Sequence, residues 1–181
     1  MRKELRIAGF GGQGVITIGV LMAKALGQYG ESHVAQTQSY GPEARGGACK
    51  TDVVTSDAEI DYIKPMNLDV MAAMSQPSLN AYESSLRDDG RLLVDSTLVS
   101  EVPERFKDVV SVPATSLAED QLGMKVVANV IMFGALARAT GWANPEACKK
   151  AIADTVPKKA LEKNYEAFDL GYSYTGKESQ S

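Results

Sequence analysis

The residues best suited to chemistry lie in two glycine-containing stretches near the N-terminus. The first stretch reads Gly9-Phe10-Gly11-Gly12-Gln13-Gly14. Gly9, Gly11 and Gly14 have the G-x-G-x-x-G spacing, after an apolar run and before a helical pattern. Glycines permit tight turns and close approach of a ligand, and the first amides of a helix attract anions. Two interpretations remain open: this turn contacts an anionic ligand, or Gly11 and Gly14 only permit close packing of helix and strand.

The second stretch follows the second predicted strand and reads Gln38-Ser39-Tyr40-Gly41-Pro42-Glu43-Ala44-Arg45-Gly46-Gly47. It therefore leaves the carboxyl end of a strand, where open α/β sheets bind ligands. Arg45 has the planar fork that suits a carboxylate or phosphate, Gly46 allows positive φ, and Tyr40 offers a face for stacking. Alternatively, Arg45 pairs with Glu43 or a carbonyl and braces a rigid turn. The residue types alone leave both interpretations standing.

A nicotinamide dinucleotide site is not predicted. Such a site uses an acidic residue about 20 positions after the glycine turn, at the end of the second strand. Here that strand ends at Gln36-Thr37-Gln38-Ser39, and Glu31 precedes it. The basic residue that an NADP site needs is also missing from this position.

The hydrophobic periodicity predicts a single α/β domain over residues 1–181. Strands are predicted at 5–9, 33–37, 48–55, 68–74, 91–95 and 108–112, and helices at 12–29, 76–88, 116–122, 125–140, 145–154 and 158–168. Gly30 and Gly90 are read as helix stops, and 171–181 as a flexible tail.

The connection between the second and third predicted strands indicates how the sheet is arranged. About ten residues without a helical pattern separate these strands, whereas a parallel crossover requires a dozen or more residues. We therefore expect a Rossmann-like, doubly wound and mostly parallel sheet with an antiparallel excursion. Helices are expected on both faces, with a helical C-terminal part.

Composition and charge exclude several classes of partner. The net charge is −4, without a long basic run, which argues against nucleic acid. No apolar stretch reaches the roughly 20 residues of a membrane span, and the N-terminus lacks the pattern of a signal peptide. We expect a cytoplasmic protein.

The metal-binding capacity of the chain is small. It has two cysteines, Cys49 and Cys148, and one histidine, fewer than an iron–sulfur cluster or a Cys/His zinc site requires. We therefore expect no metal in this chain alone, and expect both thiols to be buried or inert.

The two glycine-containing stretches together resemble the signatures of the gamma subunit, or gamma domain, of 2-oxoacid:acceptor oxidoreductases. The resemblance continues through Ser56–Ile60, Ala72–Gln76 and Val94–Ser96, and covers roughly residues 5–140. The stretch Ser39–Gly47 is most similar to that of 2-oxoglutarate and branched-chain members, whereas pyruvate and indolepyruvate members tend to differ there.

The resemblance implies a multi-subunit complex that converts a 2-oxoacid, expected to be 2-oxoglutarate, and coenzyme A to acyl-CoA and carbon dioxide, with reduction of ferredoxin. It places thiamine diphosphate and Mg²⁺ on alpha and beta subunits, and [4Fe–4S] clusters on beta and ferredoxin-like delta subunits. The gamma subunit would support assembly and border the coenzyme A site, without catalytic or metal-binding residues. The residues expected to contact coenzyme A are Gly9, Gly11, Gly12, Gln13, Gly14, Ser39, Tyr40, Arg45 and Gly46.

Three alternatives remain at this point. The chain could be an assembly module without a small-molecule site, a free-standing nucleotide-binding protein, or a subunit of the branched-chain or indolepyruvate enzyme. A homodimer of the isolated chain is also compatible with the sequence. Substrate choice is expected to lie with the thiamine-binding subunits.

Overall fold

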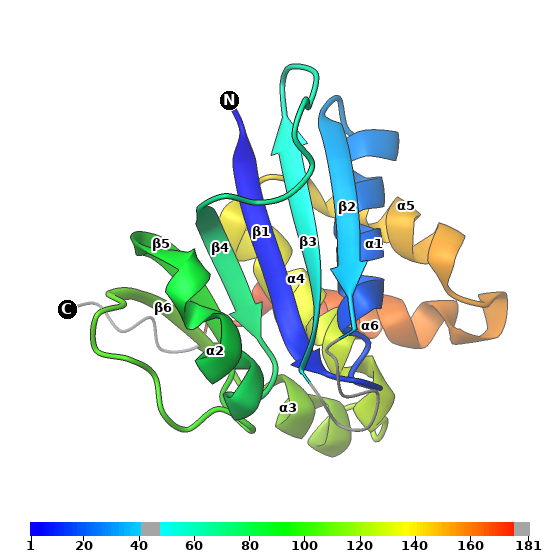
Figure 1. Ribbon diagram of the computed structural model, residues 1–181. Coiled ribbons are helices and arrows are strands. Elements are labelled where there is room, and N and C mark those ends of the chain that lie inside the picture. The colour runs from blue at the N-terminus through cyan, green and yellow to red at the C-terminus, as the bar shows by residue number, and fades with distance from the viewer. Residues whose placement is uncertain (41–47, 176–181) are drawn as a thin grey trace.

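The computed structural model describes residues 1–40 and 48–175, and its strands form one sheet in the order β2-β3-β1-β4-β5-β6 (Figure 1). The strands are β1 (Lys3–Phe10), β2 (His33–Ser39), β3 (Ala48–Ser56), β4 (Leu68–Ala73), β5 (Leu86–Asp95) and β6 (Asp108–Val112). β4 is parallel to β1, β5 to β4 and β6 to β5, whereas β3 is antiparallel to both β1 and β2. The predicted α/β class, with a mostly parallel sheet and an antiparallel excursion, is confirmed.

The position of β3 distinguishes the strand order of this sheet from that of a dinucleotide-binding sheet. In the dinucleotide-binding order the second strand lies beside the first. Here β3 lies between them, because the short connection after β2 returns the chain as an antiparallel hairpin. The end of β2 therefore lies one strand farther from the glycine turn than a dinucleotide site requires.

Helices cover the two faces of the sheet unequally. One face carries α1 (Val15–Ala23), which continues as a π-helical turn (Lys24–Gln28), with α4 (Ala128–Thr140), α5 (Pro145–Thr155) and α6 (Leu161–Ser173) (Figure 1). The other face carries α2 (Gln76–Tyr82). The remaining helical segments are Glu83–Ser85, α3 (Ala114–Asp120), Lys125–Val127 and Lys158–Ala160.

The main core lies between the sheet and the larger helical layer. Alternate strand residues such as Leu5, Ile7 and Val53 are fully buried and point to this side. A smaller core under α2 contains Met71 and Leu92. Burial of both sheet faces explains why the strands have long apolar runs.

Two glycines allow α4 and α6 to cross at short range. A Cβ atom on Gly171 would lie 1.9 Å from the carbonyl oxygen of Ile131, and one on Gly134 would lie 2.2 Å from that of Phe168. The rings of Phe133 and Phe168 lie 5.5 Å apart between centroids in the same contact. Gly171 is therefore a packing residue inside a helix.

Several predicted boundaries were wrong, and the causes are physical. The first helix begins at Val15, not at residue 12, because Gly12 and Gly14 have φ angles of 89° and 73°. The last helix continues to Ser173, so the predicted tail from residue 171 begins too early, and residues 176–181 lie outside the described part. The helix predicted over 76–88 ends at Tyr82, and a short 3-10 turn follows it.

Gly90 was also misread as a helix stop, since β5 already begins at Leu86. The pairing of β4 with β5 shifts between Leu68 and Val70, which leaves a bulge in β5. A Cβ atom on Gly90 would lie 3.1 Å from the carbonyl oxygen of Asp69 and 2.6 Å from Leu86. A glycine is therefore needed at position 90 because β4 and β5 approach each other closely there.

Replacement of Gly171 by Ala tests the helix crossing. Alanine favours a helix by about 1 kcal/mol over glycine, but overpacking costs about 1–3 kcal/mol and here the overlap is with backbone. We expect Gly171→Ala to lower the free energy of unfolding by about 2 kcal/mol in chemical denaturation followed by circular dichroism. Gly11→Ala is the control, because its added Cβ meets no described atom within 4 Å. Equal stability of the two variants would contradict the tight crossing.

Candidate functional site

The glycine turn between β1 and α1 contains glycines with different structural roles. Gly12 and Gly14 have positive φ, which favours glycine. A Cβ atom on Gly14 would also lie 2.3 Å from Nδ2 of Asn129, and one on Gly9 would lie 2.5 Å from Oε1 of Gln13. The packing interpretation therefore holds for Gly14.

Neither packing nor backbone conformation in the described part of the chain requires a glycine at position 11. Its φ is not positive, and an added Cβ atom would meet nothing within 4 Å in the part of the chain that the structure describes. Gly11 and Gly12 are both exposed to solvent. The packing interpretation is therefore unsupported for Gly11, and the turn presents a backbone surface to open space.

The Gln13 side chain holds the turn in place. Its Oε1 accepts a hydrogen bond from the Phe10 amide at 2.6 Å, and its Nε2 donates to the Met74 carbonyl at 2.9 Å. The turn is thereby tied to the end of β4. The Gln13 side chain is engaged within the protein, so any outward contact of this residue has to use its backbone.

A pocket of about 300 Å³ lies beside the turn. Its lining residues are Gly12, Gln13, Met74, Leu98, Thr115, Lys125, Val126 and Ala128. The walls are mainly apolar, and Lys125 is the cationic residue among them. Its Nζ atom lies 3.5 Å from Oε1 of Glu119. Because 68% of the Lys125 side chain is exposed, this ion pair is weak and leaves the ammonium group free to contact an anion.

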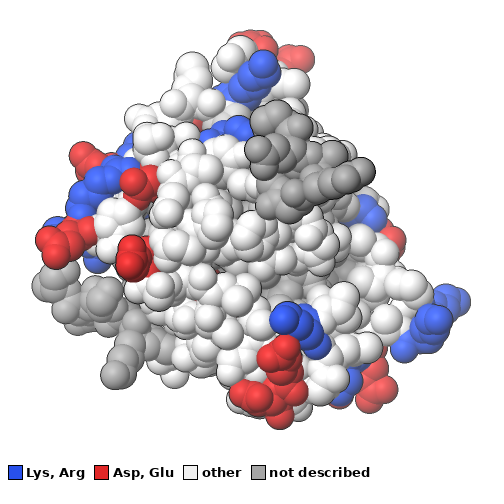
Figure 2. Space-filling view, turned by 60° about the horizontal axis from the view of Figure 1, so that its bottom comes forward, with Lys and Arg blue, Asp and Glu red and all other residues white. Residues whose placement is uncertain are grey.

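Among the described residues, few charged side chains lie on the molecular surface at this end of the sheet. Figure 2 looks toward the carboxyl ends of the parallel strands and shows a broad area of uncharged described residues, with Lys, Arg, Asp and Glu gathered at its margin. Leu98, Met124 and Val126 contribute exposed apolar side chains, with 39%, 40% and 70% of their areas accessible. The surface around the pocket is therefore suited to contact with another protein.

Asp95 braces the loop and helix next to the pocket. This fully buried carboxylate accepts hydrogen bonds from the Thr97 amide at 3.1 Å and from the Thr115 amide and hydroxyl at 3.2 and 2.6 Å. The amide of Thr115 belongs to the first turn of α3, so Asp95 acts as a remote cap. Its role in the described structure is to position backbone.

The second glycine-containing stretch begins at the same edge of the sheet. Ser39 pairs with Lys50 on β3, and Lys50 pairs with Ala8 on β1. Ser39 therefore lies roughly 10 Å from β1, across two strand spacings. Tyr40 follows with 67% of its area exposed. Arg45 and Gly46, which were predicted to bind a ligand, lie outside the described residues.

Sequence reasoning found the glycine turn but missed the opposite wall of the pocket. Leu98, Thr115, Lys125 and Val126 come from segments at least 84 positions after Gly14. One signal was present for Thr115, because it lies between the strand predicted at 108–112 and the helix predicted at 116–122. A helix that starts after a parallel strand begins at the carboxyl edge of the sheet, where the glycine turn also lies.

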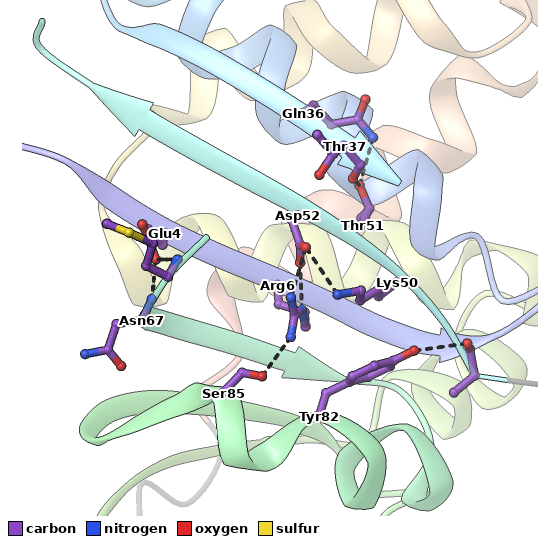
Figure 3. Close-up of polar contacts among 12 residues, drawn as sticks. Glu4, Arg6, Gln36, Thr37, Lys50, Thr51, Asp52, Asn67, Tyr82 and Ser85 are labelled. Atoms are coloured by element: carbon purple, nitrogen blue, oxygen red, sulfur yellow. Dashed lines mark hydrogen bonds and ion pairs between the residues drawn. The ribbon is translucent and has the colours of Figure 1, made fainter. Parts of the chain in front are cut away.

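A buried polar network fixes the strand that follows the second stretch. Arg6 on β1 donates to Asp52 on β3 through Nε at 2.7 Å and Nη2 at 3.0 Å, and through Nη1 to Ser85 Oγ at 2.9 Å (Figure 3). The Nζ atom of Lys50 lies 3.5 Å from Oδ2 of Asp52. The Tyr82 hydroxyl donates to the Ala48 carbonyl at 3.3 Å, so α2 holds the point where the chain re-enters the sheet.

Comparison with known proteins gives the family. The model of the family described as pyruvate ferredoxin/flavodoxin oxidoreductase matches residues 4–174, and the chain belongs to this family. The 2-oxoglutarate synthase subunit KorC of Methanocaldococcus jannaschii is 44% identical over 174 residues, which cover 95% of this chain and 93% of that protein.

Solved structures agree with this assignment. The keto/oxoacid ferredoxin oxidoreductase gamma subunit from Geobacter sulfurreducens has a TM-score of 0.88 at 37% identity, with 95% of both chains covered. The predicted resemblance to gamma subunits is therefore confirmed. A chain of 2-oxoglutarate:ferredoxin oxidoreductase from Magnetococcus marinus, solved with 2-oxoglutarate, coenzyme A and succinyl-CoA bound, shares the fold with a TM-score of 0.82 at 21% identity. The match covers 99% of this chain and 32% of that one.

Neither a cluster of metal ligands nor a membrane-spanning helix is present among the described residues. Within residues 1–40 and 48–175, no three His, Cys, Asp or Glu side chains converge to hold a metal ion. No helix in this part is long and apolar enough to span a bilayer. Cys49 and Cys148 are buried, as predicted, and burial raises the pKa of both thiols, to about 12 for Cys148.

Removal of the Asp52 carboxylate tests the network of Figure 3. Asp52→Ala leaves the Arg6 guanidinium buried without its partner, because only 8% of each side chain is exposed. Breaking a buried ion pair from one side costs about 3–5 kcal/mol. We expect a fall of that size in the free energy of unfolding, measured by urea denaturation. A fall below about 1 kcal/mol would show that the pair contributes little.

The raised pKa of Cys148 predicts a loss of stability in alkali. The thiol has an ordinary pKa of 9.0 and a folded pKa of about 12, so the fold favours the neutral form. This contribution is fully present below pH 9 and is lost as the pH rises from 9 toward 12. Denaturation curves at pH 8 and pH 10 should therefore differ less for Cys148→Ala than for the unaltered chain. Rapid alkylation of Cys148 in the native protein at pH 8 would contradict its burial.

Proposed function

We propose that this chain is the gamma subunit of a 2-oxoglutarate:ferredoxin oxidoreductase complex, in which it supports assembly and borders the site of coenzyme A. The complex converts a 2-oxoacid and coenzyme A to acyl-CoA and carbon dioxide, and ferredoxin accepts the electrons that are released. The 44% identity to the 2-oxoglutarate synthase subunit supports 2-oxoglutarate as the substrate of the complex. The coenzyme A role rests on the open space over Gly11, beside the pocket.

The chemistry of the pocket suits part of coenzyme A. Its apolar walls, which include Met74, Leu98 and Val126, match the flexible pantetheine arm of the molecule. The first turn of α1 has no side-chain cap and no acidic residue, so its amides and the positive end of the helix dipole favour a phosphate. Lys125 at the pocket, and Arg45 in the second stretch, add cations for the phosphate groups.

The division of labour among the subunits is the one that the family resemblance implies. Thiamine diphosphate, Mg²⁺ and the [4Fe–4S] clusters belong to the alpha, beta and delta subunits in this proposal. This chain binds and orients coenzyme A and supplies no catalytic group. The pocket is open on one side, and a thiamine-binding subunit that closes it would bury the exposed Met124 and Val126.

An assembly module without a small-molecule site is the main alternative. Two observations favour it: the Gln13 side chain is engaged within the turn, and Lys125 has Glu119 as a neighbour. A branched-chain 2-oxoacid as substrate is the second alternative. It differs from the main proposal only in the thiamine-binding subunits, so this chain does not discriminate between the two.

Substitution of Gly11 separates a ligand role from a structural one. Gly11→Val fills the open space over the turn without a clash in the described structure, so the isolated chain should keep its stability. In the assembled complex we expect the KM for coenzyme A to rise about tenfold, equivalent to about 1.4 kcal/mol, with little change in kcat. Arg45→Ala should act in the same direction by removing a phosphate contact.

The matched control is Lys158→Ala, which removes an exposed charge between α5 and α6 from a residue that does not line the pocket. Normal coenzyme A kinetics for both Gly11→Val and Arg45→Ala in an intact complex would leave the assembly alternative. Anaerobic purification of the tagged chain should recover thiamine- and cluster-bearing subunits. The recovered complex should act on 2-oxoglutarate in preference to branched-chain oxoacids or pyruvate. Absence of such subunits would overturn the proposal as a whole.

A further inference from the structure

The connection between β3 and β4, residues 57–67, exposes a group of large apolar side chains. This amino-end loop lies at the end of the sheet opposite the glycine turn, near the N-terminus (Figure 1). Tyr62, Ile63 and Met66 are 53%, 50% and 74% exposed. Single exposed apolar residues are common, but three within five positions of one loop mark a contact surface.

The backbone of the amino-end loop is held by a buried carboxylate. Glu4 on β1 is 4% exposed, and its Oε2 accepts hydrogen bonds from the amides of Met66 and Asn67, both at 2.7 Å (Figure 3). Its Oε1 accepts a bond from Arg2 Nε at 2.7 Å. Charge-assisted bonds of this kind are among the stronger hydrogen bonds in proteins.

Arg2 extends this anchoring to the middle of the amino-end loop. Its Nη1 donates to the Tyr62 carbonyl at 2.6 Å and its Nη2 to the Lys64 carbonyl at 2.9 Å. The polar backbone groups are thus held inward while the apolar side chains point outward. A loop fixed in this way loses little conformational entropy when a partner binds.

The charges around these side chains indicate the kind of partner. Asp57, Glu59 and Asp61 are exposed on the amino-end loop, and Lys64 is its basic residue, which gives the loop residues a net charge of −2. The N-terminal ammonium group pairs with Asp57 and reduces the net charge at this surface to −1. Two copies of the chain that met through this loop would bring the same acidic residues together. A surface with an apolar centre and a rim of Lys and Arg fits the loop instead.

We infer that the amino-end loop is a docking surface for another subunit of the complex, one whose contact area is apolar and bordered by basic side chains. This inference rests on the assembly role proposed above and names the surface that carries it out. β1 has eight residues and spans roughly 25 Å, so a subunit docked here leaves the pocket at the glycine turn accessible.

The test uses the full chain and a subcomplex of the other subunits purified without it, under anaerobic conditions. Binding kinetics are measured at several ionic strengths. Ile63→Ser combined with Met66→Ser should raise Kd by about tenfold or more, mainly through faster dissociation. Asp61→Lys should lower the association rate at low salt and flatten its salt dependence. Glu162→Lys on α6 changes the net charge by the same amount and should leave the association rate and its salt dependence unchanged. Since Asp61, Ile63 and Met66 are exposed, their variants should retain the melting temperature of the unaltered chain. Glu162→Lys should lower it slightly, because Glu162 lies in the first turn of α6, where an acidic residue favours the helix.

Each result has a distinct meaning. A double variant that binds within twofold of the unaltered chain would overturn the inference, as would a faster association of Asp61→Lys. Self-association of the isolated chain that the double variant abolishes would show that the occupant is a second copy and would also overturn it. Failure of the unaltered chain to bind the subcomplex would instead refute the assembly role itself.

Discussion

Arg6 and Asp52 face each other across β1 and β3, and this contact constrains the register of the two strands. Both charges are almost excluded from water, so each needs the other and the bidentate geometry that satisfies both. A slip of one residue would turn the Asp52 side chain to the opposite face of the sheet, into the apolar layer beneath α1. The pair thereby favours a single register of β3 against β1, whatever its net contribution to stability.

That register determines where the two functional ends of the molecule lie. Ala48 pairs with Phe10, so the second glycine-containing stretch rejoins the sheet directly beside the glycine turn. β3 then runs antiparallel to β1 and finishes at the other end, where the amino-end loop begins. One antiparallel strand therefore connects the proposed coenzyme A site with the proposed docking surface. Because this strand lies between β1 and β2, β2 is at the edge of the sheet. β1 and β2 are therefore not neighbours, as they are in a dinucleotide site.

The sequence predicted what depends on local pattern, and it failed where distant segments meet. Alternation and short connections were enough for the strands and for the antiparallel excursion. Gly90 and Gly171 were misread as a helix stop and as the start of the tail, because their actual neighbours, the Asp69 and Ile131 carbonyls, lie far away in the chain. The same applies to the site: the glycine turn was visible as a motif, whereas its pocket needs Leu98 and Lys125 from later segments. The roles of Arg45 and Gly46 stay predictions.

The glycine turn also limits what the chain can contribute by itself to the proposed coenzyme A site. Gly9, Gly12 and Gly14 are each required by packing or backbone conformation, and the Gln13 side chain is used within the turn. What remains at its outer surface is backbone and the open space at Gly11. Backbone amides attract an anion but distinguish poorly between one phosphate compound and another. In the proposed role, selectivity for coenzyme A would therefore come from groups outside the turn, in the second stretch and on the subunits that close the pocket, and assembly would be a condition for recognition.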